Sequence, residues 1–303
     1  MELRHLRYFC TVAEELNLTR AAERLHIAQP PLTRQIKQLE EEVGAELFKR
    51  GPRGLSLTPA GQFFLEHARQ VLEKVKTTVQ ATRRLAEKQR AVFGIGFVPS
   101  VFYGQLPSLI RRLRQNNNVE VVLMELLSLQ QAQALKAGRI DIGFGRIRID
   151  DPEIDQELLF DEPILAALPS SHPLADTTPC LAELADCPLI VYPATPGPNF
   201  SDIVTGLFRQ HGLGVNVIQH VNDVQTAIGL VASEMGFTLV PEQVSRVQRD
   251  DVAYVGLAEG NITSPVLCCR RKESPSELML QVNEILRELV ENRLSGRYPP
   301  PRD

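Results

Sequence analysis

Hydrophobic positions near the start of the chain recur at the spacing of two short amphipathic helices. The first helical face carries Ala21, Ala22 and Leu25. After a connection at residues 26–28, apolar residues return at steps of four, three and four, at Leu32, Ile36, Leu39 and Val43. This is the period of an α-helix with one buried stripe. Thr19 is a predicted N-cap of the first helix, and Pro30 and Pro31 suit the first turn of the second, where a missing N–H costs little.

The polar residues of the second helix gather toward its N-terminal end, at Gln29, Thr33, Arg34 and Lys37. A recognition helix presents this end to base edges in the major groove of DNA. There Arg34 could fork onto a guanine, Gln29 could pair with an adenine, and Thr33 could reach a phosphate or a thymine methyl group. Most charged helix faces are only solvated, so this pattern alone leaves DNA binding open.

Two short alternating stretches, residues 47–48 and 55–57, flank the sequence RGPRG and predict a β-hairpin wing. Arg53 at its tip is placed to enter a minor groove or to bind a phosphate. Residues 1–90 contain 16 Lys and Arg against 11 Asp and Glu, a net charge of +5. The remaining residues contain 17 and 26, a net charge of −9. A basic N-terminal part on an acidic body favours a winged helix-turn-helix that faces phosphate.

A long helix is predicted over residues 59–88. Thr58 and Pro59 form an N-cap followed by proline at the first helical position. Two apolar rows follow: Leu65, Leu72, Val79 and Ala86 at steps of seven, and at alternating steps of four and three Phe64, Ala68, Val71, Val75, Thr78, Thr82 and Leu85. At ~1.5 Å per residue such a helix spans roughly 45 Å. It either pairs with a second copy or packs on its own domain.

The rest of the chain alternates predicted strands and helices, the pattern of open α/β sheets with crossover helices. The predicted strands are residues 92–98, 119–126, 139–144, 163–168, 188–192, 215–221, 237–240, 252–257 and 265–270. The predicted helices are residues 103–116, 129–137, 202–211, 224–233 and 276–293.

Composition agrees with a globular protein that stays in the cytoplasm. Hydrophobic residues make up 43% and charged residues 23% of the 303 positions, which is ordinary globular usage. The N-terminus lacks the apolar core of a signal peptide, and no apolar run approaches the length of a membrane span. The five cysteines include no CxxC pair and predict no metal site. Cys268 and Cys269 adjoin in a predicted strand and should face opposite sides; they are either buried thiols or a redox pair.

The first 68 residues resemble the N-terminal domain of LysR-type transcriptional regulators, most specifically in the run AAERLHIAQPPLTRQIKQLE from Ala21 to Glu40. The resemblance continues to about residue 290. Within the family the chain is most similar to regulators of aromatic (benzoate, catechol and chlorocatechol) catabolism. The stretches that carry this narrower similarity are AQPPL at 28–32, LKAGRID at 135–141, GFGR at 143–146 and PNFS at 198–201.

The resemblance implies a winged helix-turn-helix at residues 1–58, a linker and dimerisation helix at 59–90, and an effector domain at 91–295. The effector domain would resemble periplasmic binding proteins. Subdomain I would comprise residues 91–161 and 267–295, and subdomain II residues 162–266. Residues 296–303 would form a disordered tail. The implied partners are an interrupted palindrome in promoter DNA, a second copy in a dimer or a tetramer, and RNA polymerase, with no membrane.

Ligands of open α/β sheets bind outside the carboxyl ends of the strands. Three loops join such an end to a helix, where hydroxyls and free amides form anion sites. They carry Ser100, Ser128, Asn199 and Ser201 as candidate carboxylate ligands, with Phe102 and Phe200 as apolar walls. Each serine alone is more often an N-cap, and it is the resemblance that brings the three loops together. Arg146 matches a family position near the cleft, where it could neutralise a carboxylate or brace the two subdomains.

These loops imply a small effector rather than a cofactor, a mono- or dicarboxylate such as cis,cis-muconate. Ser128 stands where similar regulators often carry threonine, and Leu126-Leu127 replaces a more usual Met-Gly pair. These departures keep the hydroxyl but make the pocket wall bulkier, which puts the identity of the effector in doubt. The sign of regulation, although activation is typical of the subgroup, also stays open.

Enzymatic activity is not expected, because GxSxG, HExxH and a complete P-loop are absent from the sequence. Gly94-Ile95-Gly96 begins a dinucleotide fingerprint, but Pro99 occupies the third glycine position. No catalytic residue and no metal ligand is therefore predicted. A small-molecule receptor without a DNA role is the rival from another class, and the basic N-terminal part argues against it.

Overall fold

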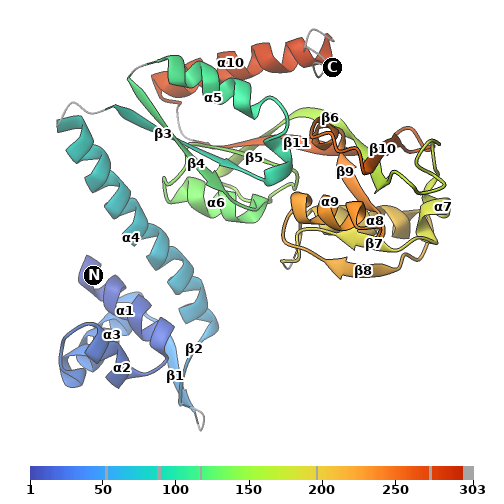
Figure 1. Ribbon diagram of the computed structural model, residues 1–303. Coiled ribbons are helices and arrows are strands. Elements are labelled where there is room, and N and C mark those ends of the chain that lie inside the picture. The colour runs from blue at the N-terminus through green and yellow to red at the C-terminus, as the bar shows by residue number, and fades with distance from the viewer. Residues whose placement is uncertain (52–53, 87–89, 117, 196, 273–274, 296–303) are drawn as a thin grey trace. The chain divides into compact units, whose positions relative to one another are not determined.

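The computed structural model describes residues 1–51, 54–86, 90–116, 118–195, 197–272 and 275–295. The chain divides into two compact units (Figure 1). The first comprises Met1–Lys88 with Lys136–Gly138, and the second Gln89–Leu135 with Arg139–Asp303. Arg53 and the predicted disordered tail lie outside the described residues. Among the described helices, none is long and apolar enough to cross a membrane.

The first unit begins with three helices and a hairpin: α1 (Leu3–Glu15), α2 (Leu18–Arg24), α3 (Gln29–Val43), β1 (Phe48–Gly51) and β2 (Gly54–Leu57). β1 and β2 pair antiparallel, which confirms the predicted wing. Phe9 is fully buried at the centre, and its ring lies 5.2 Å from that of Phe48 and 5.1 Å from that of Phe64. Leu32 and Leu39 of α3 are also fully buried, as the helical period predicted.

The starts of α2 and α3 correct the prediction for Thr19 and confirm those for Pro30 and Pro31. Thr19 is not an N-cap, because the side chain of Asn17 caps α2 and accepts the backbone N–H groups of Thr19 and Arg20 at 2.9 and 3.1 Å. Asparagine suits this position at least as well as threonine, so the helix begins before Thr19. Pro30 and Pro31 do lie in the first turn of α3.

The long predicted helix is α4 (Pro59–Ala86). The Thr58 hydroxyl accepts the Gly61 N–H at 2.9 Å, so Thr58 is the predicted cap. Leu65 and Ala68 are buried in the core with Phe9. Phe63, by contrast, is 67% exposed, and Val71 and Val79 are each 45% exposed. Leu65 and Ala68 therefore pack α4 on its own domain, while Phe63, Val71 and Val79 stay exposed.

The second unit is built on a seven-stranded sheet. Its main path runs in the order β10 (Val252–Gly256), β6 (Ile154–Pro169), β11 (Thr263–Arg271), β5 (Ile142–Gly145), β3 (Ala91–Phe97) and β4 (Val119–Glu125), and β9 (Thr238–Pro241) pairs with β6 off this path. β3 is parallel to β4 and β5. A smaller parallel pair joins β7 (Leu189–Val191) to β8 (Val217–His220). The alternating pattern therefore predicted the α/β class correctly.

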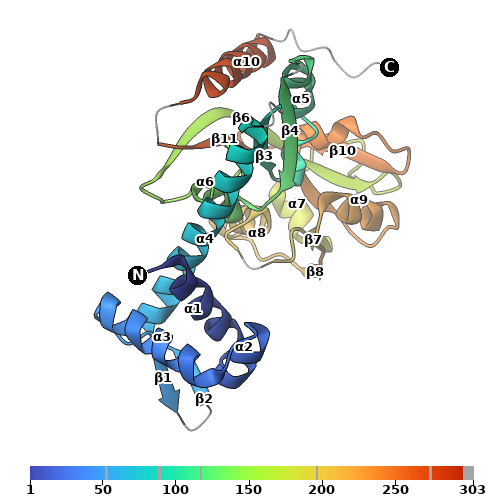
Figure 2. The same ribbon diagram turned by 90° about the vertical axis from the view of Figure 1, so that its left-hand side faces the viewer.

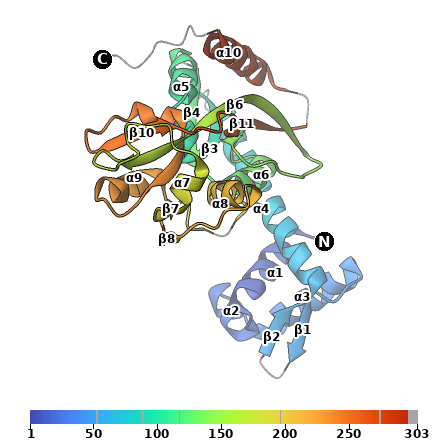
Figure 3. The ribbon, with the colours of Figure 1, turned by 90° about the vertical axis from the view of Figure 1, so that its right-hand side faces the viewer.

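The helices of this unit are α5 (Leu106–Gln115), α6 (Ser128–Lys136), α7 (Leu181–Ala185), α8 (Phe200–Gln210), α9 (Val224–Ala232) and α10 (Glu277–Leu294). Two short 3₁₀ helices are added, η1 (Pro99–Val101) and η2 (Glu242–Arg246). In Figure 2, α5 and α10 lie on one side of the sheet that contains β3 and β4, and Figure 3 shows α8 and α9 beside β7 in the other half of the unit.

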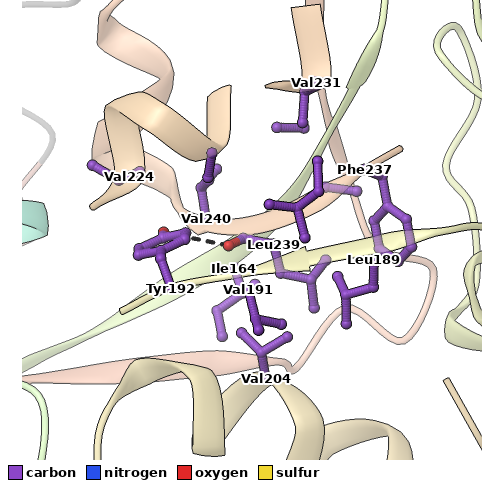
Figure 4. Close-up of a cluster of buried hydrophobic side chains, with 14 of the residues drawn as sticks. Ile164, Leu189, Val191, Tyr192, Val204, Val224, Val231, Phe237, Leu239 and Val240 are labelled. Carbon is purple, nitrogen blue, oxygen red and sulfur yellow. Dashed lines mark hydrogen bonds between the residues drawn. The ribbon is translucent and has the colours of Figure 1, made fainter. Parts of the chain in front are cut away.

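Two separate hydrophobic cores underlie these halves. One joins α5 and α10 to β3, β5 and β11. The other lies around β7, β9, α8 and α9, with Phe208, Phe237 and Leu239 fully buried (Figure 4). β6 and β11 run through both halves, because the first part of β6 pairs with β11 and its last part pairs with β9 and β10. The chain therefore passes between the two cores on these two strands.

Several element boundaries differ from the predictions. β6 begins at Ile154 rather than at 163, because the residues before 163 carry four carboxylates that mask the strand pattern. α5 begins at Leu106 rather than at 103, since residues 102–105 form a turn. β5 begins at Ile142 rather than at 139, because the N–H of Arg139 still bonds to the Ala134 carbonyl at the end of α6. α1, α7 and η2 were not predicted.

Candidate DNA interface and ligand pocket

The outer face of α3 carries the residues that sequence predicted for base contact. The side chains of Gln29, Pro30, Arg34 and Lys37 are exposed. Thr33 is half-buried and its hydroxyl donates to the Gln29 carbonyl at 3.0 Å, so only its oxygen lone pairs are left for a partner. Pro31 is half-buried, and Thr19 is exposed in the first turn of α2.

The cations of this unit differ in whether they already have partners. Arg20 and Arg24 both bind Glu15, and these two hydrogen bonds hold the pKa of its carboxyl below the usual value. Lys37 is 3.8 Å from Glu41 in an exposed pair, which contributes little. Arg34 makes no ion pair or side-chain hydrogen bond to any described residue. Its planar fork of N–H donors is therefore open to a base edge or a phosphate.

A cavity of about 260 Å³ lies in the second unit, between the two cores. The residues that line it lie at the carboxyl ends of the parallel strands β3 and β4 and at the starts of three helices, α6, α8 and α9. This is where open α/β sheets bind ligands. Of the residues predicted to bind an effector, Ser100, Ser128, Arg146, Asn199 and Phe200 line this cavity.

The two predicted serine hydroxyls meet around Arg146. Ser128 Oγ accepts the backbone N–H of Arg146 at 3.3 Å, and Ser100 Oγ accepts the Arg146 Nε–H at 2.7 Å. Each hydroxyl keeps its own O–H to donate, because both bonds use it as an acceptor. A Cβ at Gly145 would lie 2.6 Å from Ser128 Oγ, so glycine is needed there for the hydroxyl to approach the strand.

Arg146 forms an ion pair with a buried carboxylate. Its Nη2 lies 2.6 Å from Oε2 of Glu162 on β6, and the two side chains are 2% and 0% exposed. A second, longer contact of 3.4 Å reaches the Ser264 hydroxyl on β11. Oε1 of Glu162 accepts the backbone N–H of Gln243 in η2 at 2.8 Å. Glu162 therefore neutralises the charge of Arg146, and these contacts join Arg146 to β6, β11 and η2, while its role toward an effector stays a prediction.

The start of α8 is a capping box with an aromatic wall beside it. Asn199 accepts the Ser201 N–H at 2.9 Å and donates to the Thr195 carbonyl at 2.6 Å. Asp202 accepts the Asn199 N–H at 2.8 Å. Phe200 packs on Tyr192, with ring centroids 5.3 Å apart. Burial raises the pKa of Tyr192, whose O–H donates to the Leu239 carbonyl at 3.4 Å (Figure 4).

Two predicted effector residues do not line the cavity. Phe102 is 39% exposed in the turn after η1, and its ring packs on Phe97 with centroids 5.2 Å apart. Ser201 lies in the first turn of α8, away from the cavity, and only its backbone N–H takes part in the cap. The apolar wall is formed instead by residues that include Leu126, Leu127, Tyr192 and Phe200.

Sequence reasoning missed the third helix start, at α9. Asp223 caps this helix by accepting the Thr226 N–H at 2.9 Å and the Thr226 hydroxyl at 2.8 Å, and Asn222, Asp223 and Val224 line the cavity. The same strand-to-helix signal that marked the other loops was present after β8. The missed cavity residues also include Glu125, Gln130, Pro193 and Thr195.

The three helix starts differ in charge. α8 carries Asp202 in its first turn and α9 is capped by Asp223, so a carboxylate already faces each N-terminus. The first turn of α6 contains no acidic residue. The partial positive charge of a helix N-terminus attracts anions. Together with the hydroxyls of Ser100 and Ser128, the start of α6 is therefore the most favourable anion position in the cavity.

The predicted redox pair is deeply buried. Cys268 and Cys269 are 0% and 1% exposed, and they belong to different hydrophobic clusters on opposite faces of β11, as the alternation of a strand predicted. Burial raises the pKa of the Cys268 thiol to about 12 and also raises that of Cys269. Because the thiolate is the reactive form, this environment disfavours redox chemistry at both residues.

Comparison with known protein families matches both parts of the chain. Residues 3–62 match the model described as bacterial regulatory helix-turn-helix protein, lysR family, and residues 86–291 match the model of the LysR substrate binding domain. The chain is 50% identical to the transcriptional regulator CatR of Pseudomonas putida, over 96% of this chain and all of CatR. It is 42% identical to BenM of Acinetobacter baylyi, over 99% of each protein.

Solved structures agree with these matches. The structure of CbnR, a LysR family transcriptional regulator, aligns at a TM-score of 0.70 and 30% identity, over 96% of this chain and 99% of CbnR. Full-length CbnR has also been solved with its target DNA, and it aligns at 0.70 and 31% identity over 95% and 100%. The effector binding domain of BenM with its effector benzoate aligns at 0.64 and 36% identity, over 70% and 97%.

Proposed function

Because the chain belongs to the LysR family of bacterial transcriptional regulators, we propose that a small carboxylate in its cavity changes how it binds a promoter. As a member of this family it is a DNA-binding regulator related to regulators of aromatic catabolism, and not an enzyme. What the proposal adds is the class of effector, the residues that bind it, and the response on DNA.

The DNA contacts in this proposal come from the outer face of α3. Gln29, Pro30, Thr33 and Arg34 read one half of an interrupted palindrome, while Lys37 binds phosphate and Arg53 enters the minor groove. The open guanidinium of Arg34 supports this assignment, as does the structure of CbnR with its target DNA. Thr19 and Pro31 lie at the edge of this surface as further contacts.

The effector in this proposal is an organic acid such as cis,cis-muconate or an aromatic acid. Its carboxylate binds at the start of α6 and accepts hydrogen bonds from the hydroxyls of Ser100 and Ser128. Asn199 and Phe200 bound the opposite side. The observation that carries the proposal is the arrangement of these two hydroxyls around Arg146, at a helix start without a carboxylate of its own. BenM, solved with benzoate as its effector, is a relative that binds an acid of this size.

The architecture in this proposal keeps the expected division into a DNA-binding domain (1–58), a linker helix (59–90) and an effector domain (91–295). Two α4 helices pair through exposed apolar side chains that include Val71 and Val79, and they present two recognition helices to two half-sites. Two such dimers form a tetramer. The protein acts in the cytoplasm, and a direct contact with RNA polymerase belongs to the same proposal.

The effector class is tested by isothermal titration calorimetry of the full-length protein. cis,cis-Muconate and benzoate are the acid probes, and catechol is the uncharged control. The proposal expects at least one acid to bind and catechol not to bind. Binding of catechol with no binding of either acid would contradict an anion site.

A further inference from the structure

A row of hydrogen-bonded side chains joins α1 to one flank of α3. It begins at His5, which is only 2% exposed, with 2.8 Å between its Nε2 and Oε1 of Gln35. The Gln35 amide donates to Oε1 of Gln38 at 3.3 Å, and the Gln38 amide donates to Oε1 of Glu42 at 3.2 Å. We call these four residues the His5 row. A buried imidazole is thereby connected to a carboxylate on the recognition helix.

The direction of every bond in the His5 row follows from the tautomer of one ring. Nδ1 of His5 lies 3.2 Å from the backbone N–H of Glu2, which can only donate. Nδ1 must therefore be the acceptor nitrogen, and Nε2 carries the proton that it donates to Gln35. Each glutamine then accepts through its oxygen and donates through its nitrogen. The row ends at the carboxylate of Glu42, which can only accept. The donor and acceptor roles are consistent only with a neutral His5.

The His5 row borders the face that reads DNA. Positions 35, 38 and 42 follow one another by three and four residues, so they share one flank of α3 between its buried stripe and its outer face. Gln38 follows Arg34 by four residues and is its neighbour on the helix surface. The His5–Gln35 bond is the member of the row that joins α1 to α3, so it constrains α3 on the flank beside Arg34.

The charged groups around His5 come from α1 and α3. On α1, Glu2 pairs with Arg4 at 2.9 Å. On α3, the carboxylate of Glu42 closes the row, and the N-terminal ammonium of Met1 holds its pKa below the usual value. Among the described residues of α2 and α4, no charged side chain hydrogen-bonds to the His5 ring.

We infer that His5 is a positioning residue for operator recognition, which in its neutral Nε2–H form orients the recognition helix through Gln35. The inference rests on the DNA-binding role described above. A side chain at position 5 that cannot donate to Gln35 removes the bond that aligns α3. Operator discrimination accordingly falls in such a variant, while binding to random DNA, which depends on total charge, is retained.

The test uses a duplex that the full-length wild-type protein selects from a random-sequence pool, with a scrambled duplex as the non-specific partner. Affinities for both are measured by fluorescence anisotropy. His5→Gln keeps one acceptor and one donor group, whereas His5→Leu removes both. Gln35→Leu breaks the row at its second member. His220→Gln, an exposed histidine on β8, is the matched control.

His5→Leu and Gln35→Leu are expected to lose about five-fold or more of the selected-to-scrambled affinity ratio, the scale of one hydrogen bond. Their melting temperature and scrambled-DNA affinity should stay close to wild type. His5→Gln and His220→Gln should keep the wild-type ratio. A Gln35→Leu ratio equal to wild type, or an equal loss in His5→Gln and His5→Leu, would overturn the inference alone. Failure of the wild type to select any duplex would overturn the DNA-binding role as well.

Discussion

Arg146 and Glu162 form an ion pair with 2.6 Å between Nη2 and Oε2, at the floor of the cavity and closed off from water. Glu162 lies on one of the two strands that join the cores, and it also binds the backbone of η2 through Gln243. The pair therefore connects the wall of the ligand cavity to the strands that join the two cores. A ligand that binds the hydroxyl of Ser100 or Ser128 contacts a group that is itself hydrogen-bonded to Arg146.

Glu162→Gln should destabilise the second unit by about 3–5 kcal/mol, because it leaves the buried guanidinium of Arg146 without a counter-charge. Urea unfolding followed by circular dichroism measures the change. Asp251→Asn removes the carboxylate of an exposed pair with Arg249 and is the matched control, for which little change is expected. Equal stability of the two variants would show that the buried pair does not hold the unit together.

Ser128→Ala should weaken binding of the acid effector about ten-fold or more, since a hydrogen bond to a charged group contributes about 1.5–3 kcal/mol. Affinity for DNA without effector should stay unchanged, because the hydroxyl lies in the other unit. Calorimetry and fluorescence anisotropy measure the two quantities. Ser201→Ala is the control, because this serine does not line the cavity. Unchanged effector affinity in Ser128→Ala would remove Ser128 from the site.

Arg34→Ala should cost about 1–3 kcal/mol of discrimination between selected and scrambled DNA if its fork binds a base. Lys37→Ala should instead weaken both complexes alike and reduce the salt dependence of binding, as a phosphate contact does. Salt titrations of both variants on both duplexes separate the two roles. An equal loss on the two duplexes for Arg34→Ala would reassign Arg34 to phosphate.

Peroxide should leave DNA binding unchanged, because burial keeps the thiols of Cys268 and Cys269 protonated. In the native protein, a thiol-alkylating reagent should modify the partly exposed Cys180 and Cys187 first, as mass spectrometry of digests can show. A footprint that peroxide alters in the wild type, but not in a Cys268→Ser, Cys269→Ser double variant, would restore the redox hypothesis.

Local periodicity predicted most of the first unit, but it missed α1. Leu32, Ile36 and Leu39 are buried where a helical stripe placed them, and the wing pairs as expected. The error at Thr19 arose because Asn17, two residues earlier, is also a good capping residue, and its side chain is the one that caps α2.

The cavity was less predictable, because its residues come from loops far apart in the sequence. Strand-to-helix junctions pointed to Ser100, Ser128, Asn199 and Phe200, all of which line it. The sequence did not reveal that Glu162 pairs with Arg146, because the two residues are 16 positions apart and the strand that begins between them carries several other carboxylates. Phe102 was misplaced because a turn before α5 directs its ring onto Phe97.

An acid bound in the cavity is expected to change the arrangement of the protein on DNA. A ligand can do so only by binding the two arrangements with different affinity. This is measured by nuclease footprinting of the full-length protein on its selected duplex, with and without a saturating acid identified by calorimetry. We expect the protected boundaries to shift in the wild type and in Ser201→Ala, but not in Ser128→Ala at the same acid concentration. A footprint that the bound acid leaves unchanged in the wild type would contradict this expectation.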